Sequence, residues 1–62
     1  MYVARFIRRG CPDELFFYTK LEDALGHAKL FVGDDSGLYD KIVVENVETE
    51  QSEFSLNFEG VA

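Results

Sequence analysis

Two side chains of the sequence could serve as nucleophile and base, and they stand in separate segments. Cys11 follows Arg8 and Arg9 in the turn-forming stretch GCPDE, and neighbouring arginines can activate a thiol as a nucleophile. A nucleophilic cysteine also needs a base within hydrogen-bond reach. His27 is the chain's one histidine, and the sequence offers no route that brings it to this turn. We therefore expect Cys11 to be a surface thiol, and we expect a protein that is not an enzyme and has no catalytic residues.

The ligand inventory does not favour a metal site. One cysteine and one histidine are too few for structural zinc. His27 follows Asp23 by four positions, so the two can meet on a helix surface as an ordinary pair. A calcium loop that starts at Asp34 would have Tyr39 at its sixth position, where glycine is required, and the register that starts at Asp35 fails as well. We expect no metal and no cofactor.

The whole chain has a net charge of −6, and its acidic residues gather in the second half. Residues 34–62 hold eight of the twelve acidic residues and one of the six basic ones. A negative surface steers association with a positive one, so we predict an acidic interaction surface for a basic protein partner, formed by Glu45, Glu48, Glu50 and Glu53. The alternative is that these carboxylates only keep the outer side of a sheet soluble.

The basic stretch ARFIRR places Phe6 among arginines, and such aromatics can stack on single-stranded bases. The net charge of −6 removes the phosphate attraction that supplies most non-specific affinity. Direct nucleic-acid binding is therefore not expected. A chain this small also has little room for a small-molecule pocket.

A chain of 62 residues is enough for one domain, residues 1–62. Such a domain buries only about 60% of the surface of its unfolded chain, so it needs further support. The single cysteine excludes an internal disulfide, which leaves six Phe and three Tyr to build an apolar core, with oligomerisation as a second support. No segment approaches the ~20 apolar residues of a membrane span. The unpaired cysteine fits a cytoplasmic protein.

Hydrophobic periodicity predicts the element order β-β-α-β-β. Residues 2–9, 15–19, 41–49 and 54–59 have the composition or alternation of strands. The segment TKLE matches a capping box of Thr19 and Glu22, and apolar residues then recur at helical spacing from Leu21 to Val32, ahead of Gly33. The imperfect alternation of 41–49 indicates either two partly covered faces or a bulge near residues 45–46.

This order predicts an α+β fold, a four-stranded and mostly antiparallel sheet with one helix on one face. We favour the strand order 2-1-4-3, with the terminal strands adjacent and parallel at the centre; the order 2-1-3-4 is also compatible with a right-handed crossover. A single helix leaves one face uncovered, and apolar residues there would form an interaction face. We assign to it Val3, Ile7, Phe16 and Tyr18. The opposite phase of the second strand would place Leu15 and Phe17 there.

The segment YTKLEDALGHAKLF, followed by a strand, is similar to a pattern in short phage and mobile-element proteins, where a strand with a Thr cap leads into a helix L-x-x-A-L-x-x-A. Small phage inhibitors of host RNA polymerase and several anti-CRISPR proteins have similar architecture. The likeness covers about 15 residues, mostly a helix-start pattern, and places no functional residue. It implies a bacterial or phage protein that inhibits a host factor by binding it. The alternative is a homo-oligomeric structural or regulatory module, in which the apolar face closes on itself.

Overall fold

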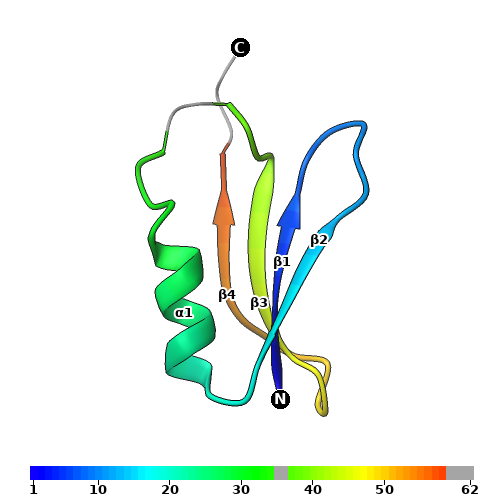
Figure 1. Ribbon diagram of the computed structural model, residues 1–62, viewed down its shortest axis with the longest axis vertical. Helices are drawn as coiled ribbons and strands as arrows, with labels where there is room; N and C mark the ends of the chain where they lie inside the picture. The colour runs from blue at the N-terminus through cyan, green and yellow to red at the C-terminus, as the bar shows by residue number, and fades with distance from the viewer. Residues whose placement is uncertain (35–36, 59–62) are drawn as a thin grey trace.

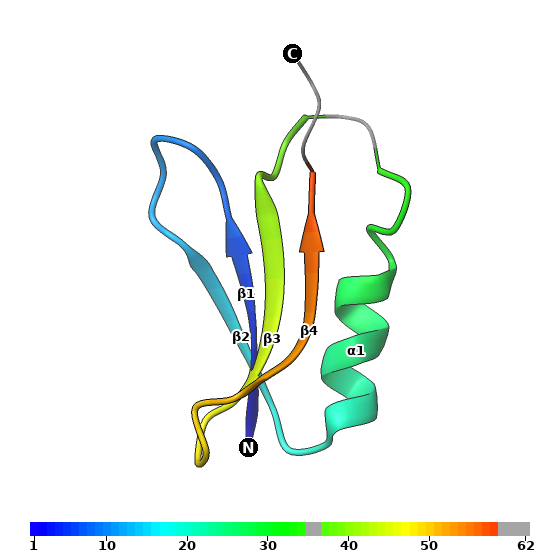
Figure 2. The same ribbon diagram turned by 180° about the vertical axis from the view of Figure 1, so that it is seen from behind.

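The computed structural model describes residues 1–34 and 37–58. They form one four-stranded antiparallel sheet, in the order β2-β1-β3-β4, with one helix across one face (Figure 1). The elements are β1 (Tyr2–Ile7), β2 (Glu14–Tyr18), α1 (Leu21–Lys29), β3 (Lys41–Asn46) and β4 (Ser52–Asn57). The α+β class and the β-β-α-β-β order are therefore confirmed. Figure 2 shows the β1–β2 and β3–β4 loops at opposite ends of the sheet.

The strand order differs from the favoured expectation. β3 and not β4 pairs with β1, and the pairing is antiparallel, so the order 2-1-4-3 with a parallel centre is wrong and 2-1-3-4 is correct. The three consecutive residues Ile42, Val43 and Val44 are all buried, which favours a central strand with a neighbouring strand on each side. β4 alternates Phe54 and Leu56 with polar residues, which suits an edge strand.

The core lies between the sheet and α1. Its fully buried side chains are Ala4, Phe6, Ile42 and Val44 from the sheet and Ala24 and Ala28 from the helix. Because alanines face the sheet, the helix can lie close to it. The ring of Phe6 forms edge contacts with Phe16, Phe31 and Tyr39, with centroids 5.2–5.5 Å apart. Phe6 is therefore the centre of an aromatic cluster beneath the helix.

The start of α1 differs from the predicted capping box. The residue before the helix is Lys20, in an extended conformation with φ −115° and ψ 137°, and no side chain caps the first turn by a hydrogen bond. Thr19 and Glu22 therefore do not cap each other. Glu22 and Asp23 still place negative charge in the first turn, where it stabilises the helix dipole.

The end of α1 comes earlier than the apolar spacing predicted. Beyond Lys29, the amides of Phe31 and Val32 donate to carbonyls three residues earlier, at 3.1 and 3.2 Å, so the last turns are tighter than an α-helix. Gly33 follows with φ +81°, the left-handed conformation expected of a glycine that ends a helix. With nine residues in α1, the described part of the chain contains no helix that is long and apolar enough to cross a membrane.

The β3–β4 hairpin contains a bulge and a left-handed residue. The register between the two strands shifts after Val44, where Glu53 is the extra residue. A bulge near residues 45–46 was one of the two alternatives predicted; the irregularity lies beside Glu45, but its extra residue belongs to β4 and not to β3. Glu50 has φ +60°, and its amide donates to the carbonyl of Asn46 at 2.7 Å. The side-chain oxygen of Asn46 accepts from the amide of Glu48 at 2.9 Å. These bonds shape the turn and bring Glu50 back toward the sheet.

Candidate interaction surface

The face of the sheet turned away from α1 is not covered by any element of residues 1–34 and 37–58. Side chains alternate between the two faces of a strand, so the pairing registers define this open face. Its members from the first three strands are Val3, Arg5 and Ile7 of β1, Leu15 and Phe17 of β2, and Lys41, Val43 and Glu45 of β3. The prediction that Val3 and Ile7 lie on the uncovered side is therefore confirmed.

β2 has the opposite phase to the one we assigned. Phe16 pairs with Ala4 and Tyr18 pairs with Tyr2, so both lie on the helix side, and their placement on the uncovered face is wrong. Leu15 to Tyr18 are all apolar or aromatic, so their pattern does not show which of them face the helix and which face away from it. The pairing with β1 decides the face of each residue instead, and it places Leu15 and Phe17 on the open face.

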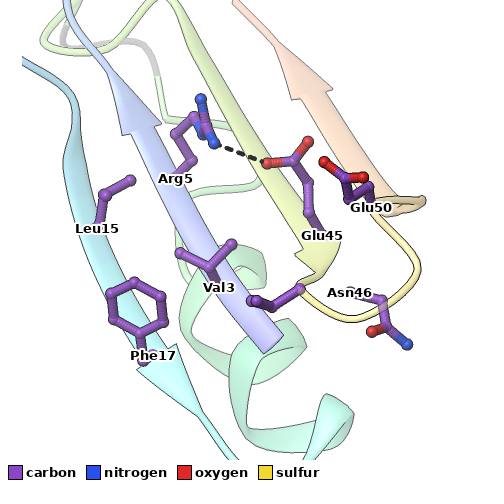
Figure 3. Close-up of a pocket in the computed structure, with 8 residues that line it drawn as sticks. Val3, Arg5, Leu15, Phe17, Glu45, Asn46 and Glu50 are labelled. Carbon is purple, nitrogen blue, oxygen red and sulfur yellow. Dashed lines mark ion pairs between the residues drawn. The ribbon is translucent and has the colours of Figure 1, made fainter. Parts of the chain in front are cut away.

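The open face contains an open groove of about 250 Å³ (Figure 3). The groove is lined by Val3, Arg5, Leu15, Phe17, Glu45, Asn46, Val47 and Glu50. Its volume lies below the roughly 300–1,000 Å³ of typical small-molecule sites. The groove therefore suits one or two side chains of a partner better than a whole cofactor.

One wall of the groove is apolar. Leu15 is 47% exposed, Phe17 57% and Val47 43%, around Val3, which is only 6% exposed. Figure 3 shows Leu15 and Phe17 on the β2 side of Val3. Exposed apolar side chains that line a single groove are typical of an interaction site.

The other wall is charged, and part of its charge is already neutralised. The guanidinium of Arg5 lies 3.1 Å from a carboxylate oxygen of Glu45 and 3.8 Å from one of Asp13. Glu50 lines the same groove and forms no ion pair within residues 1–34 and 37–58. Glu50 is therefore the uncompensated carboxylate of the groove.

The structure brings together two of the four predicted acidic residues. Glu45 and Glu50 line the groove. Glu48 lies in the turn, 3.7 Å from the amino group of Met1. Glu53 is the bulge residue of the edge strand β4. The sequence identified the acidic residues and Val3, gave Leu15 and Phe17 only as the alternative, and did not assign Val47 to this face.

Cys11 is exposed and free, in the β1–β2 loop. No group of three or more His, Cys, Asp or Glu side chains in the described ranges is arranged to hold a metal ion.

His27 belongs to the aromatic cluster and forms no ion pair with Asp23 among the described residues. Its Nδ1 lies 2.7 Å from the hydroxyl of Tyr18, and its ring lies 4.7 Å from that of Phe6. The sequence held a signal for this position, because His27 stands three residues after the buried Ala24 and four before Phe31, on the apolar stripe. His27 is therefore part of the helix–sheet contact.

Tyr39 joins the same cluster to a charged pair at its margin. Its hydroxyl donates to a carboxylate oxygen of Glu14 at 3.3 Å, and the Nε of Arg8 lies 3.8 Å from that oxygen. Burial raises the pKa of Tyr39 above its ordinary value of 10, and the negative charge of Glu14 raises it further. The phenol is therefore kept neutral as a donor.

Comparisons of the chain with protein-family models, with curated proteins and with solved structures found no match. What the protein binds is therefore inferred from the geometry of the open face.

Proposed function

We propose that this chain is a small non-enzymatic protein that binds another protein through its open face. The observation that carries the proposal is the exposure of Leu15, Phe17 and Val47 around one groove. Aromatic side chains that become buried at the centre of an interface supply much of its binding energy. On the helix side, by contrast, the large side chains of Phe6, Ile42 and Val44 are already buried in the core.

The groove favours a partner segment that presents an apolar side chain next to a lysine or an arginine. The apolar side chain would pack between Leu15, Phe17 and Val47. The cationic group would pair with Glu50, which has no ion pair within the described part of the chain. Arg5 already pairs with Glu45 at 3.1 Å, so a partner need not neutralise it. This arrangement supports the basic partner expected from the net charge.

Affinity capture with matched variants tests the apolar contact. We expect wild type to retain a specific protein and Phe17→Ser to bind it at least roughly tenfold more weakly, because the substitution removes an aromatic anchor. Leu30→Ser is the control, because Leu30 is 79% exposed but lies at the end of α1, outside the groove. Equal retention by wild type and Phe17→Ser would exclude the open face as the binding surface.

Salt dependence tests the role of Glu50. Glu50→Gln removes the charge and keeps the shape, so we expect slower association and a weaker dependence of the association rate on salt. Glu53→Gln removes the same charge at β4 and should have a smaller effect. Association of the wild-type protein that does not respond to salt would contradict the basic partner.

Inhibition of a host factor, and a bacterial or phage source, remain predictions that depend on the resemblance of the helix start. Identification of the captured protein tests both. A captured protein with no counterpart in a bacterial host would contradict them.

A further inference from the structure

Within residues 1–34 and 37–58, β2 is an edge strand with no partner on its outer side. It pairs with β1 alone, and no backbone hydrogen bond among the described residues reaches its outer edge. Leu15 and Phe17 are exposed on the open face, and Phe16 is 39% exposed on the helix side. An edge strand that exposes apolar side chains on both faces is a template for pairing with another strand.

The opposite edge of the sheet is protected against such pairing. β4 exposes the polar residues Ser52, Ser55 and Asn57, and Glu53 adds a charge at the bulge. Charges and bulges are the devices by which natural sheets prevent pairing at their edges. β2 contains no proline, lysine or bulge, and its one charge is Glu14 at its first position. The β4 edge is therefore protected against pairing with another strand, and the β2 edge is not.

The helix leaves the β2 edge accessible. The ring of Phe16 lies 4.8 Å from that of His27, yet Phe16 keeps 39% of its surface exposed. α1 therefore covers the inner part of β2 but does not extend over its outer edge.

We propose that two copies of this chain pair through β2, antiparallel, about a two-fold axis at Phe16, so that one sheet continues across both copies. In this register Phe16 lies opposite Phe16 of the second copy, and Leu15 lies opposite Phe17. Glu14, the strand's one charge, lies opposite Tyr18, so no like charges meet. Aromatic and aliphatic cross-strand pairs are favourable, and a two-fold axis uses the same surface on both copies.

A second copy fits this edge because the register sets the one charge of β2, Glu14, opposite an uncharged residue and sets its apolar side chains opposite one another. It would also supply the further support that a domain of this size needs. The pairing shares Leu15 and Phe17 with the groove of the proposed function. Its central residue Phe16 lies on the helix side, so variants at Phe16 and at Val47 distinguish the two proposals.

Sedimentation over about 1 μM to 1 mM protein tests the pairing. We expect wild type to change from monomer to dimer within this range, and we expect Phe16→Lys to weaken the dimer at least roughly tenfold, because each copy would place a charge opposite its own image. Leu30→Lys adds the same charge at another exposed apolar site and should leave the dimer unchanged. A wild-type protein that stays monomeric throughout, or that forms larger assemblies only, would overturn the proposal.

A crosslink tests the register without depending on the fold of the lysine variant, since Phe16 also packs against Phe6 and His27. Directly opposed residues on antiparallel strands have Cβ atoms about 4.5–5.5 Å apart, close to disulfide reach. In a Cys11→Ser background, oxidation should link two copies of Phe16→Cys and not of Leu30→Cys. A dimer that Phe16→Cys fails to link would overturn the pairing through β2.

Val47→Ser separates this proposal from the proposed function. Val47 lines the groove and is not part of β2, so the substitution should leave the dimer unchanged and weaken capture of the other protein. Loss of the dimer in Val47→Ser would contradict pairing through the β2 edge.

Discussion

The hydroxyl of Tyr18 lies 2.7 Å from Nδ1 of His27, and this hydrogen bond joins the edge strand β2 to α1. The imidazole ring also contacts the rings of Phe16 and Phe6, at 4.8 and 4.7 Å between centroids. Since no side chain of the described residues caps the start of the helix, these contacts help to hold α1 on the sheet.

We expect Tyr18→Phe to lower the free energy of unfolding by about 1 kcal/mol, because it leaves the half-buried Nδ1 of His27 without its partner. Urea denaturation measures the change. Tyr2→Phe is the control, since Tyr2 packs against the same core but its hydroxyl bonds to none of the described residues. Equal effects of the two substitutions would mean that the hydrogen bond contributes nothing specific.

Gly26→Ala should raise stability by about 0.5–1 kcal/mol, because alanine favours the helix relative to glycine. A Cβ at Gly26 would meet no atom within 4 Å, so the substitution adds no clash. Gly33→Ala is the matched control with the opposite expected effect. Space is open there too, but φ is +81°, and a residue with a Cβ is strained in that conformation. Thermal unfolding should therefore rank Gly26→Ala above wild type and Gly33→Ala below it. The reverse order would contradict the placement of both residues.

Glu50→Gly should stabilise the β3–β4 hairpin by about 1 kcal/mol. Glu50 has φ +60°, a conformation that disfavours every residue with a Cβ and suits glycine. Glu48→Gly in the same turn has no such strain to relieve and should be neutral or destabilising. Chemical denaturation of the two variants measures the difference, and a destabilised Glu50→Gly would argue against this turn geometry.

Stability should fall at alkaline pH through Tyr39. Its pKa in the folded protein is raised above 10, so the folded state keeps a proton that the unfolded state releases. The contribution is fully present below pH 10 and is lost as pH rises through the higher pKa of the folded state. Tyr39→Phe should remove this part of the pH dependence. Urea midpoints of wild type and Tyr39→Phe that stay parallel from pH 8 to above pH 10 would contradict the raised pKa.

The element order was predictable because each element has a local signal. β4 alternates apolar Phe54 and Leu56 with polar residues, and α1 repeats Ala24 and Ala28 on one face. The capping box failed although its residues match the motif, because the chain stays extended through Lys20.

The strand order and the phase of β2 were not predictable from local pattern. The stretch from Leu15 to Tyr18 is apolar throughout, so the face of each residue depends on pairing with β1, which no window of the sequence contains. The groove was missed for the same reason. Val47 and Phe17 are 30 positions apart in the chain, and only the completed sheet brings them together.

The central β1–β3 pair has a consequence for how the chain folds. The β1–β2 and β3–β4 hairpins each join strands that are neighbours in the chain. β1 and β3 also pair, but β2, α1 and the loops around them lie between these two strands in the sequence. Hairpins and short helices form within microseconds, whereas closing a longer loop raises the entropic barrier. We therefore expect the pairing of β1 with β3 to limit the refolding rate. Until β1 and β3 pair, their unpaired edges can pair with other molecules. The yield of refolded protein should therefore fall as protein concentration rises.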